Sequence, residues 1–322
     1  KLPRALSGTV ETVRGPVALD ALGRTLMHEH VVLLSPEALA NFGHVWGARY
    51  WDEEAGVADV VAKLRRLREA GYETLVDATA IGWGRDVRRL ARINEQVDVN
   101  IVVATGVYSF IELPPFLAYR RSDQIVELFV RELREGIDDT GIKAAFLKCC
   151  VEVHGIVGDI PRILSCVATA SIETDAPVMV HTNAAHQTGR LALDFLLNAG
   201  VAPDRIVIAH MGDSNDLDYQ RAIADSGAWL GHDRFRIEHF NPDADRVRTL
   251  AALAAEGYAG QVHLGHDAAA FHDFMVGNPL FEDAVADWLH IPTTILPALL
   301  EAGVTQAQID EMLLENPRRF FT

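Results

Sequence analysis

Apolar and polar positions follow one recurring pattern along this chain. A short apolar run is followed by polar residues and then by an amphipathic segment that often ends in glycine. Residues 57–71 give the clearest helical case, because their apolar side chains recur three or four positions apart and Gly71 stands where a C-terminal cap belongs. The apolar run 72–79 that follows this helix is predicted to be a strand.

Eight apolar runs are predicted strands, and helices are predicted between them. The strands cover residues 25–30, 72–79, 100–106, 142–148, 177–181, 204–210, 228–233 and 260–267. The helices cover residues 57–71, 86–97, 123–137, 160–173, 191–200, 221–227 and 248–257. Eight alternating units in 322 residues predict an α/β fold, a (β/α)8 TIM barrel, with a doubly wound sheet as the competing architecture. No linker divides the chain, so residues 1–322 are predicted to form a single domain.

Composition narrows the class of partner. The chain has 45 acidic and 29 basic residues, a formal net charge of -16, and no block of lysine or arginine. These features argue against nucleic acid and anionic membranes and favour a small neutral substrate. No apolar run approaches the roughly 20 residues that span a bilayer. Three cysteines, two of them adjacent, do not form a disulfide framework, so a cytoplasmic location is expected, although a removed leader stays possible because the chain starts at Lys1.

Chemically active side chains stand where the predicted strands end. In a TIM barrel the active site is built at the C-terminal ends of the strands. His28 and His30 end the first strand and share one face, because side chains alternate along a strand, while Glu29 points away. The fourth, fifth, sixth and eighth strands end in Lys148, His181, His210 and Asp267.

This combination of residue types indicates a metal centre. A single histidine at a strand end is more often structural, but packing does not explain four of them with a lysine and an aspartate. Imidazole and carboxylate suit zinc, iron, cobalt or manganese, and so many ligands suit two ions about 3.5–4 Å apart. A neutral Lys148 amine can add carbon dioxide to form a carbamate that bridges two metals, with an ordinary structural lysine as the alternative.

The motifs together resemble one family over nearly the whole chain. Five motifs resemble the phosphotriesterase family of the amidohydrolase superfamily: MHEH (27–30), LK (147–148), HT (181–182), AHMGDSND (209–216) and GHD (265–267). The closing ENPRRFF (315–321) is also similar. TGVY (105–108) and HDRF (232–235) look more like the family's lactonase branch, the phosphotriesterase-like lactonases.

The resemblance implies a barrel with a binuclear centre of two divalent metal ions. Zinc is the first expectation, with cobalt, iron or manganese as alternatives. Five side chains would each bind one ion: His28, His30 and Asp267 the buried ion, and His181 and His210 the more exposed ion. Lys148, carbamylated by CO2, would bridge both ions.

The resemblance also implies an activity. A metal-bridging hydroxide would open lactones, N-acyl homoserine lactones first among them (quorum quenching), with weak promiscuous organophosphate triesterase activity. Asp267 would take the proton of the attacking water, Tyr108 would contact the lactone, and Arg234 would line the substrate channel. A homodimer is implied as well. The alternatives are a dedicated aryldialkylphosphatase and a non-catalytic metal-binding homologue.

Some residues depart from the family pattern or are set aside. The segment from 268 to about 290 is expected to form the last substrate loop, and its AAAFHDF start (268–274) is unusual. VEVHG (151–155) and His232 are unusual too. His263 and His266 are interpreted as structural. Loop or helix positions at the surface or pocket rim are expected for His44, His154, His186, His239, His272 and His290.

Overall fold

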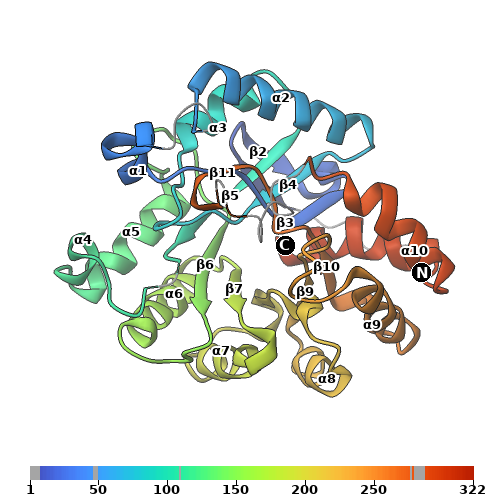
Figure 1. The fold of residues 1–322 in the computed structure, drawn as a ribbon. Helices are drawn as coiled ribbons and strands as arrows, with labels where there is room; N and C mark the ends of the chain where they lie inside the picture. The colour runs from blue at the N-terminus through green and yellow to red at the C-terminus, as the bar shows by residue number, and fades with distance from the viewer. Residues whose placement is uncertain (1–7, 46–49, 109, 276–277, 279–286) are drawn as a thin grey trace.

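A closed barrel of parallel strands forms the centre of the molecule (Figure 1). The structure, a computed structural model, describes residues 8–45, 50–108, 110–275, 278 and 287–322. Its barrel strands are β3 (Thr25–Leu33), β4 (Thr74–Asp77), β5 (Asn100–Gly106), β6 (Phe146–Val151), β7 (Val178–Thr182), β8 (Ile206–Ile208), β9 (Trp229–His232) and β10 (Val262–Leu264). Each of the eight predicted strands is therefore confirmed, and strands consecutive in sequence are neighbours in the sheet.

The barrel closes between its last and first strands. The short strand β11 (Ala269–His272) follows β10 and pairs in parallel with β3. The backbone N–H of Asp267 donates to the carbonyl of His28, and that of His30 donates to Ala268. These bonds join the two edges of the sheet, so the (β/α)8 TIM barrel is confirmed and the open doubly wound sheet is excluded.

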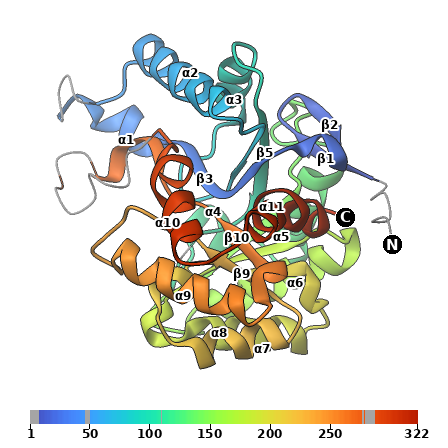
Figure 2. The same ribbon diagram turned by 90° about the vertical axis from the view of Figure 1, so that its right-hand side faces the viewer.

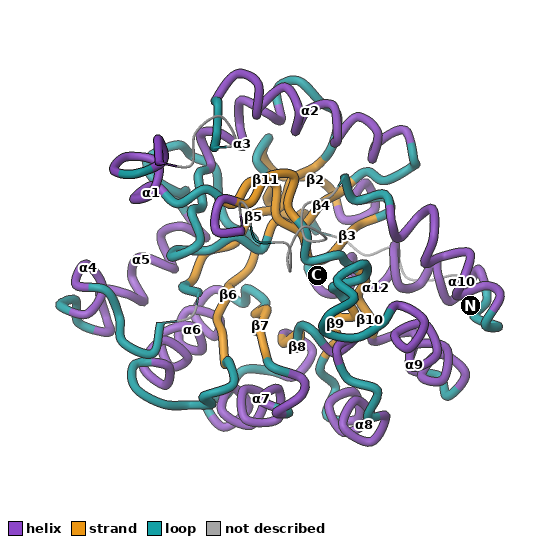
Figure 3. The backbone as a smooth tube through the Cα atoms, viewed as in Figure 1, coloured by secondary structure: helices purple, strands orange, loops and turns teal. Residues whose placement is uncertain are grey.

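Helices surround the barrel as an outer layer (Figure 3). Those between or after the barrel strands are α2 (Glu53–Glu69), α3 (Val87–Asn94), α5 (Ser122–Arg134), α6 (Ile160–Thr174), α7 (Thr188–Asn198), α8 (Leu217–Asp225), α9 (Asp243–Ala255) and α10 (Leu296–Glu301). Shorter helices are α1 (Pro36–Asn41), α4 (Pro115–Ala118), α11 (Gln306–Asp310) and α12 (Asn316–Phe320). Within the described residues, no helix has the length and apolar character that crossing a membrane requires.

Helix α2 shows how the local sequence sets an element. Its buried side chains are Val60, Val61, Leu64 and Leu67, the apolar stripe that predicted it. The helix begins at Glu53, four residues before the predicted start, because the Asp52 side chain accepts the N–H of Ala55 as an N-cap. At its other end Gly71 has a φ of 88°, a value that glycine adopts without strain.

Two apolar layers hold the fold together. One lies between the strands and the helices, and the other fills the barrel itself, where Met27, Phe146 and Met179 are buried. The bottom of the barrel is covered by an antiparallel hairpin, β1 (Thr9–Thr12) and β2 (Gly15–Ala18), and by the C-terminal phenylalanines (Figure 2). The hairpin was not predicted, since four-residue strands carry little periodic signal. The opposite, C-terminal end of the strands is therefore the open mouth.

Strand β3 contains an irregularity that shapes the mouth. Its register against β4 shifts by one residue between Leu26 and Glu29. A bulge of this kind lets two successive residues occupy one face. Met27 consequently packs inside the barrel and His28 also reaches its interior, while Glu29 points outward to His266.

Candidate metal centre

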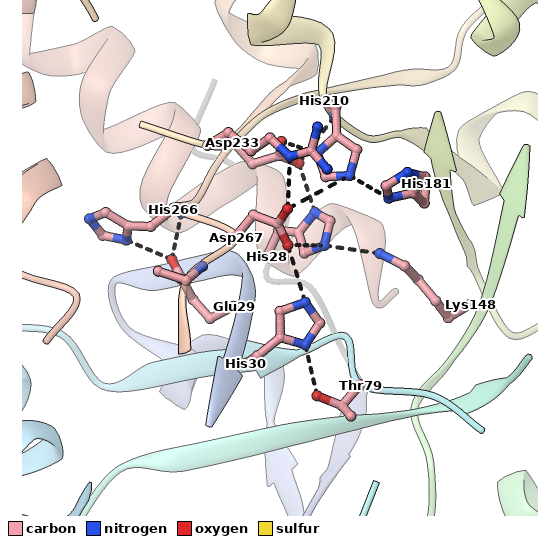
Figure 4. Close-up of polar contacts among 12 residues, drawn as sticks. His28, Glu29, His30, Thr79, Lys148, His181, His210, Asp233, His266 and Asp267 are labelled. Carbon is pink, nitrogen blue, oxygen red and sulfur yellow. Dashed lines mark hydrogen bonds and ion pairs between the residues drawn. The ribbon is translucent and has the colours of Figure 1, made fainter. Parts of the chain in front are cut away.

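The predicted site residues meet at the mouth of the barrel (Figure 4). A pocket there is lined by His28, His30, Tyr108, Lys148, His181, Arg234 and Asp267. His210 is fully buried behind them and reaches the group through its ring nitrogen. All eight side chains named from the sequence are thus brought together, although they come from seven different strands or from the turns that follow them.

One half of the centre is the deeper one. The Asp267 Oδ1 lies 3.3 Å from the His28 Nε2 and 3.1 Å from the His30 Nε2. His28, His30 and Asp267 offer ligand atoms that all lie within 4.8 Å of one another. Two imidazole nitrogens and one carboxylate oxygen at this spacing fit a divalent ion of the zinc, iron, cobalt or manganese type.

The other half lies nearer the pocket. The His210 Nε2 is 2.8 Å from the His181 Nδ1, and the Asp267 Oδ2 is 3.8 Å from the same His210 nitrogen. Asp267 therefore faces both halves with different oxygens. Neutral histidine nitrogens that face each other in a buried site are the donor set that a metal ion requires.

Lys148 stands next to the deeper half. Its Nζ lies 2.9 Å from the His28 Nε2, and the residue is 1% exposed. Burial lowers the pKa of Lys148 from its ordinary value to about 8, although Asp267 and Asp233 oppose this change. A neutral amine is therefore within reach near neutral pH, which is the form that adds carbon dioxide.

Burial also favours the neutral form of three histidines, His28, His181 and His210. It lowers the pKa of His181 to about 4 and that of His210 well below its usual range. The pKa of His28 falls for the same reason, and Lys148 adds to the effect. Neutral imidazoles carry the lone pair that a metal needs, so the electrostatics fit the donor set.

Asp233 orients two of these histidines and was missed by the sequence reasoning. Its Oδ2 accepts the Nδ1–H of His28 at 2.7 Å, and its Oδ1 accepts the Nδ1–H of His210 at 2.6 Å. Each ring then turns its Nε2 toward the centre. Burial would raise the pKa of Asp233, but His210 and His28 hold it well below its usual range.

A signal for Asp233 was present in the sequence. Gly231, His232 and Asp233 repeat the Gly-His-Asp triplet that contains Asp267. The unusual His232 is buried in this triplet, and its Nε2 lies 2.7 Å from the Gln220 Oε1, away from the centre. Thr79, which was not predicted either, lies 2.7 Å from the His30 Nδ1 through its Oγ1 and orients that ring.

Asp267 is linked to a second carboxylate through Arg234. The Arg234 Nε donates to the Asp267 Oδ2 at 2.9 Å, and its terminal nitrogen donates to Asp213 at 2.9 Å. Burial would raise the pKa of Asp267, but the neighbouring His28, His210, His30 and Arg234 hold it well below its usual range. The Asp267 carboxylate is thus ionised and held in one orientation. The positive charge of Arg234 is paired with two carboxylates, those of Asp267 and Asp213.

Three of the site residues have a left-handed backbone. The φ angles of His210, Arg234 and Asp267 are 69°, 65° and 52°. Residues other than glycine rarely adopt this region, and such conformations concentrate at functional sites. Each of the three comes shortly after the end of a barrel strand, where the turn aims the side chain into the mouth.

The pocket above the centre has mainly apolar walls. Leu33, Trp83, Ile237 and Phe240 line it together with Tyr108. The Tyr108 hydroxyl lies 3.2 Å from the His181 Nδ1, and its ring packs edge-on against Trp83 with centroids 4.4 Å apart. The guanidinium of Arg234 covers the Phe240 ring at 4.3 Å. A neutral, partly apolar substrate fits these walls.

The remaining histidines lie outside the centre, and one of them differs from its predicted position. His44, His154, His186 and His239 are exposed. His263 is buried deep in the barrel and stacks on Trp229 with centroids 4.8 Å apart. The expected loop or helix position of His272 is wrong, because this residue lies on β11, is 4% exposed and lines the pocket. Most of the expected loop up to residue 290 lies outside the described residues.

Comparisons with known proteins give matches over nearly the whole chain. Residues 8–321 match the model of the Phosphotriesterase family. A "Phosphotriesterase homology protein" of Mycobacterium tuberculosis is 38% identical, with 97% of each chain covered. An "Aryldialkylphosphatase" of Saccharolobus solfataricus is 32% identical, with 94% of this chain and 95% of the relative covered. The solved "Structure of the phosphotriesterase from Mycobacterium tuberculosis" superposes with a TM-score of 0.92 at 38% identity, covering 98% of each chain.

Proposed function

Because the chain belongs to the phosphotriesterase family of metal-dependent hydrolases, we propose that it opens the rings of neutral lactones. N-acyl homoserine lactones are the favoured class, so the biological role would be quorum quenching. Organophosphate triesters would be weak secondary substrates. The observation that carries the proposal is the Tyr108 hydroxyl, which stands 3.2 Å from the His181 Nδ1 under apolar pocket walls.

The charge balance of the pocket supports a neutral substrate. Arg234 is paired with both Asp213 and Asp267, so it does not offer an uncompensated cation to an anionic ligand. The chain as a whole carries a formal charge of -16, which repels anions further. A lactone with an acyl chain meets both conditions, since its ester is neutral and its chain is apolar.

The proposed cofactor is a pair of divalent metal ions, zinc first, with cobalt, iron or manganese as alternatives. His28, His30 and Asp267 would hold one ion, and His181 and His210 the other. When bound, such ions polarise a substrate oxygen and activate water for nucleophilic attack. Lys148 would join both ions as a carbamate, which forms when the amine nitrogen bonds to the carbon of CO2 and loses one proton to solvent.

The protein side chains supply the remaining steps. The Asp267 carboxylate takes the proton of the attacking water, because it is ionised and its Oδ2 is fixed by Arg234 at 2.9 Å. Tyr108 donates its hydroxyl proton in a hydrogen bond to the lactone and holds the ring over the centre. The apolar walls exclude bulk water from the acyl side of the substrate.

A dedicated aryldialkylphosphatase is the second candidate. The 32% identical relative named for this activity favours it, and a triester is also neutral. A non-catalytic homologue is disfavoured, because every one of the six ligand positions keeps a side chain that can bind metal.

Initial rates on two substrates distinguish the candidates. One zinc-loaded preparation is assayed with a medium-chain N-acyl homoserine lactone and with an aryl phosphotriester, each with a chelated control. A kcat/KM at least about tenfold higher for the lactone is expected, which is a difference of about 1.4 kcal/mol in transition-state binding. A faster phosphotriester would replace the proposal with the second candidate.

Two further proposals concern the oligomeric state and the cellular location of the enzyme. A homodimer is proposed from the family resemblance, and sedimentation should give twice the 35.3 kDa mass of one chain. A single 35.3 kDa species at micromolar concentration would contradict it. A cytoplasmic location is also proposed, supported by a sequence with only three cysteines, two of them adjacent and all of them buried.

A further inference from the structure

Glu152 occupies a special position beside the candidate centre. It follows β6 directly, the strand that carries Lys148, and it belongs to the unusual VEVHG segment. Its Oε1 lies 2.7 Å from the His181 Nε2, while its Oε2 accepts the backbone N–H of Val153 at 2.7 Å and the side-chain N–H of Asn183 at 3.3 Å. The carboxylate is therefore held in place from three sides.

His181 presents a different ring nitrogen to the centre than His28 and His210 do. His28 and His210 turn their Nε2 atoms inward because Asp233 accepts their Nδ1–H groups. His181 instead turns its Nδ1 toward the His210 Nε2, 2.8 Å away. Asp233 accepts one hydrogen bond from the His28 ring and one from the His210 ring, each with a different oxygen. Glu152 contacts the outward-facing Nε2 of His181, so two carboxylates together orient three rings.

The contact decides which nitrogen of His181 carries the proton. The Glu152 Oε2 accepts N–H groups of Val153 and Asn183, and its Oε1 lies 2.7 Å from the His181 Nε2, where a carboxylate oxygen acts as the acceptor. The Nε2 must therefore keep its hydrogen and donate it. The Nδ1 then carries the lone pair and faces the His210 Nε2, and this unprotonated form is the one that a metal ion binds.

We propose that Glu152 is a positioning residue that fixes the tautomer and ring orientation of His181, and through them the metal affinity of the more exposed half of the centre. This inference rests on the proposed metal centre. It does not depend on which substrate the enzyme takes. Among the described residues, Glu152 belongs neither to the converging ligand atoms nor to the pocket walls.

A purely structural role for Glu152 is the competing explanation, and the geometry gives a way to separate the two. Its side chain is 35% exposed, so removing it leaves no buried cavity. Truncation should therefore change metal binding much more than it changes folding. Glu152→Gln is the conservative variant, because its amide oxygen can still accept the Nε2–H of His181.

Metal binding, measured without substrate, tests the inference. Glu152→Ala, Glu152→Gln and wild type are stripped with a chelator and then titrated with zinc against a competing indicator; bound metal is counted by mass spectrometry. Cobalt loading adds a visible absorption spectrum that reports ligand geometry. Glu69→Ala is the matched control, since Glu69 is an exposed glutamate at the end of α2.

The expected result is a loss at one of two metal sites. Glu152→Ala should bind the second ion about 10- to 100-fold more weakly, as for other residues that orient a metal-binding histidine. Glu152→Gln should recover most of this affinity, and Glu69→Ala should match wild type. Circular dichroism should show the same fold in all four proteins.

Two outcomes would overturn the inference. One is wild-type affinity for both ions, with an unchanged cobalt spectrum, in Glu152→Ala. The other is an equal loss in Glu152→Gln and Glu152→Ala, because hydrogen-bond acceptance would then not be the cause. Failure of the lactone assay would leave these binding results intact and count only against the proposed substrate.

Discussion

At the scale of single residues, each imidazole of the centre has two nitrogens with separate tasks. One nitrogen faces the converging ligand atoms, and the other is held by Asp233, Thr79 or Glu152. A ring fixed in this way loses little freedom when an ion binds, so the site is organised in advance. The same logic extends to Asp267, whose outer oxygen is held by Arg234.

Replacing Asp267 tests the proton-transfer role at this scale. Asp267→Asn keeps the size of the side chain but removes the base and one anionic ligand. Turnover should fall by about 10²- to 10⁴-fold or more, the range of general acid–base catalysis. Initial rates and circular dichroism are the measurements, with Asp194→Asn on the exposed surface of α7 as the control. Near-normal turnover in Asp267→Asn would refute the assignment.

Replacing Tyr108 tests the lactone contact. Tyr108→Phe keeps the edge-on packing against Trp83 at 4.4 Å and removes only the hydroxyl. The kcat/KM for a lactone should fall about tenfold, as expected for one lost hydrogen bond, while the rate on an aryl phosphotriester should change little. Equal losses on both substrates would show that the hydroxyl does not select lactones.

The sequence predicted the residues that end the strands, but not the residues that orient them. His28, His30 and Asp267 could be found because strand parity and the barrel direction place them at the mouth. Asp233 and Glu152 could not be found in this way, since their roles depend on which histidine nitrogens of other strands their carboxylate oxygens contact. Only the repeated Gly-His-Asp triplet hinted at Asp233.

At the scale of elements, irregular backbone directs side chains into the barrel at positions where a regular strand would direct them outward. Strand β3 has a register shift between Leu26 and Glu29, which lets Met27 and His28 both face inward. A strict period of two would have placed Met27 with Glu29 on the outer face. The left-handed turns at His210 and Asp267 are a second example, and sequence periodicity carries no signal for either feature.

Gly106 allows two strands to approach closely beside the centre. Its φ is 108°, and a Cβ at this position would lie 2.0 Å from the Lys148 carbonyl oxygen. Gly71→Ala is the matched control, because Gly71 also has a positive φ, 88°, but a Cβ added there would meet no atom within 4 Å among the described residues.

The two glycine variants should therefore differ in stability. Gly71→Ala should lose about 1–2 kcal/mol of unfolding free energy from backbone strain alone. Gly106→Ala should lose ~1–3 kcal/mol more, because the backbone of β6 must move. Urea unfolding of both variants measures the difference. Equal losses would mean that the close approach to Lys148 is not a constraint.

At the scale of the whole molecule, the barrel and the site depend on each other. The hydrogen bonds that close the barrel join Asp267 to His28 and His30 to Ala268, so closure itself assembles the deeper half of the centre. The alternation of strands and helices was enough to predict this architecture. The bottom hairpin β1–β2 was not predictable, because its short strands lack periodicity, and the single-domain organisation of residues 1–322 stays a prediction.

Metal removal should consequently weaken the whole fold. An ion that binds only the folded chain stabilises it by about 2.7 kcal/mol when its free concentration is 100 times its Kd. Chelated protein should therefore unfold at a lower urea concentration than zinc-loaded protein, and Tm should fall. Superimposable unfolding curves would contradict a metal centre that bridges the first and last strands.

Metal-dependent lactone hydrolysis is best tested by counting metal ions and turnover in the same samples. Chelated protein is titrated with zinc, bound zinc per chain is measured by mass spectrometry, and hydrolysis of an N-acyl homoserine lactone is followed after each addition. We expect no turnover without metal and full turnover at two ions per chain. Full lactone turnover in the metal-free protein, or with a single ion per chain, would contradict a binuclear lactonase.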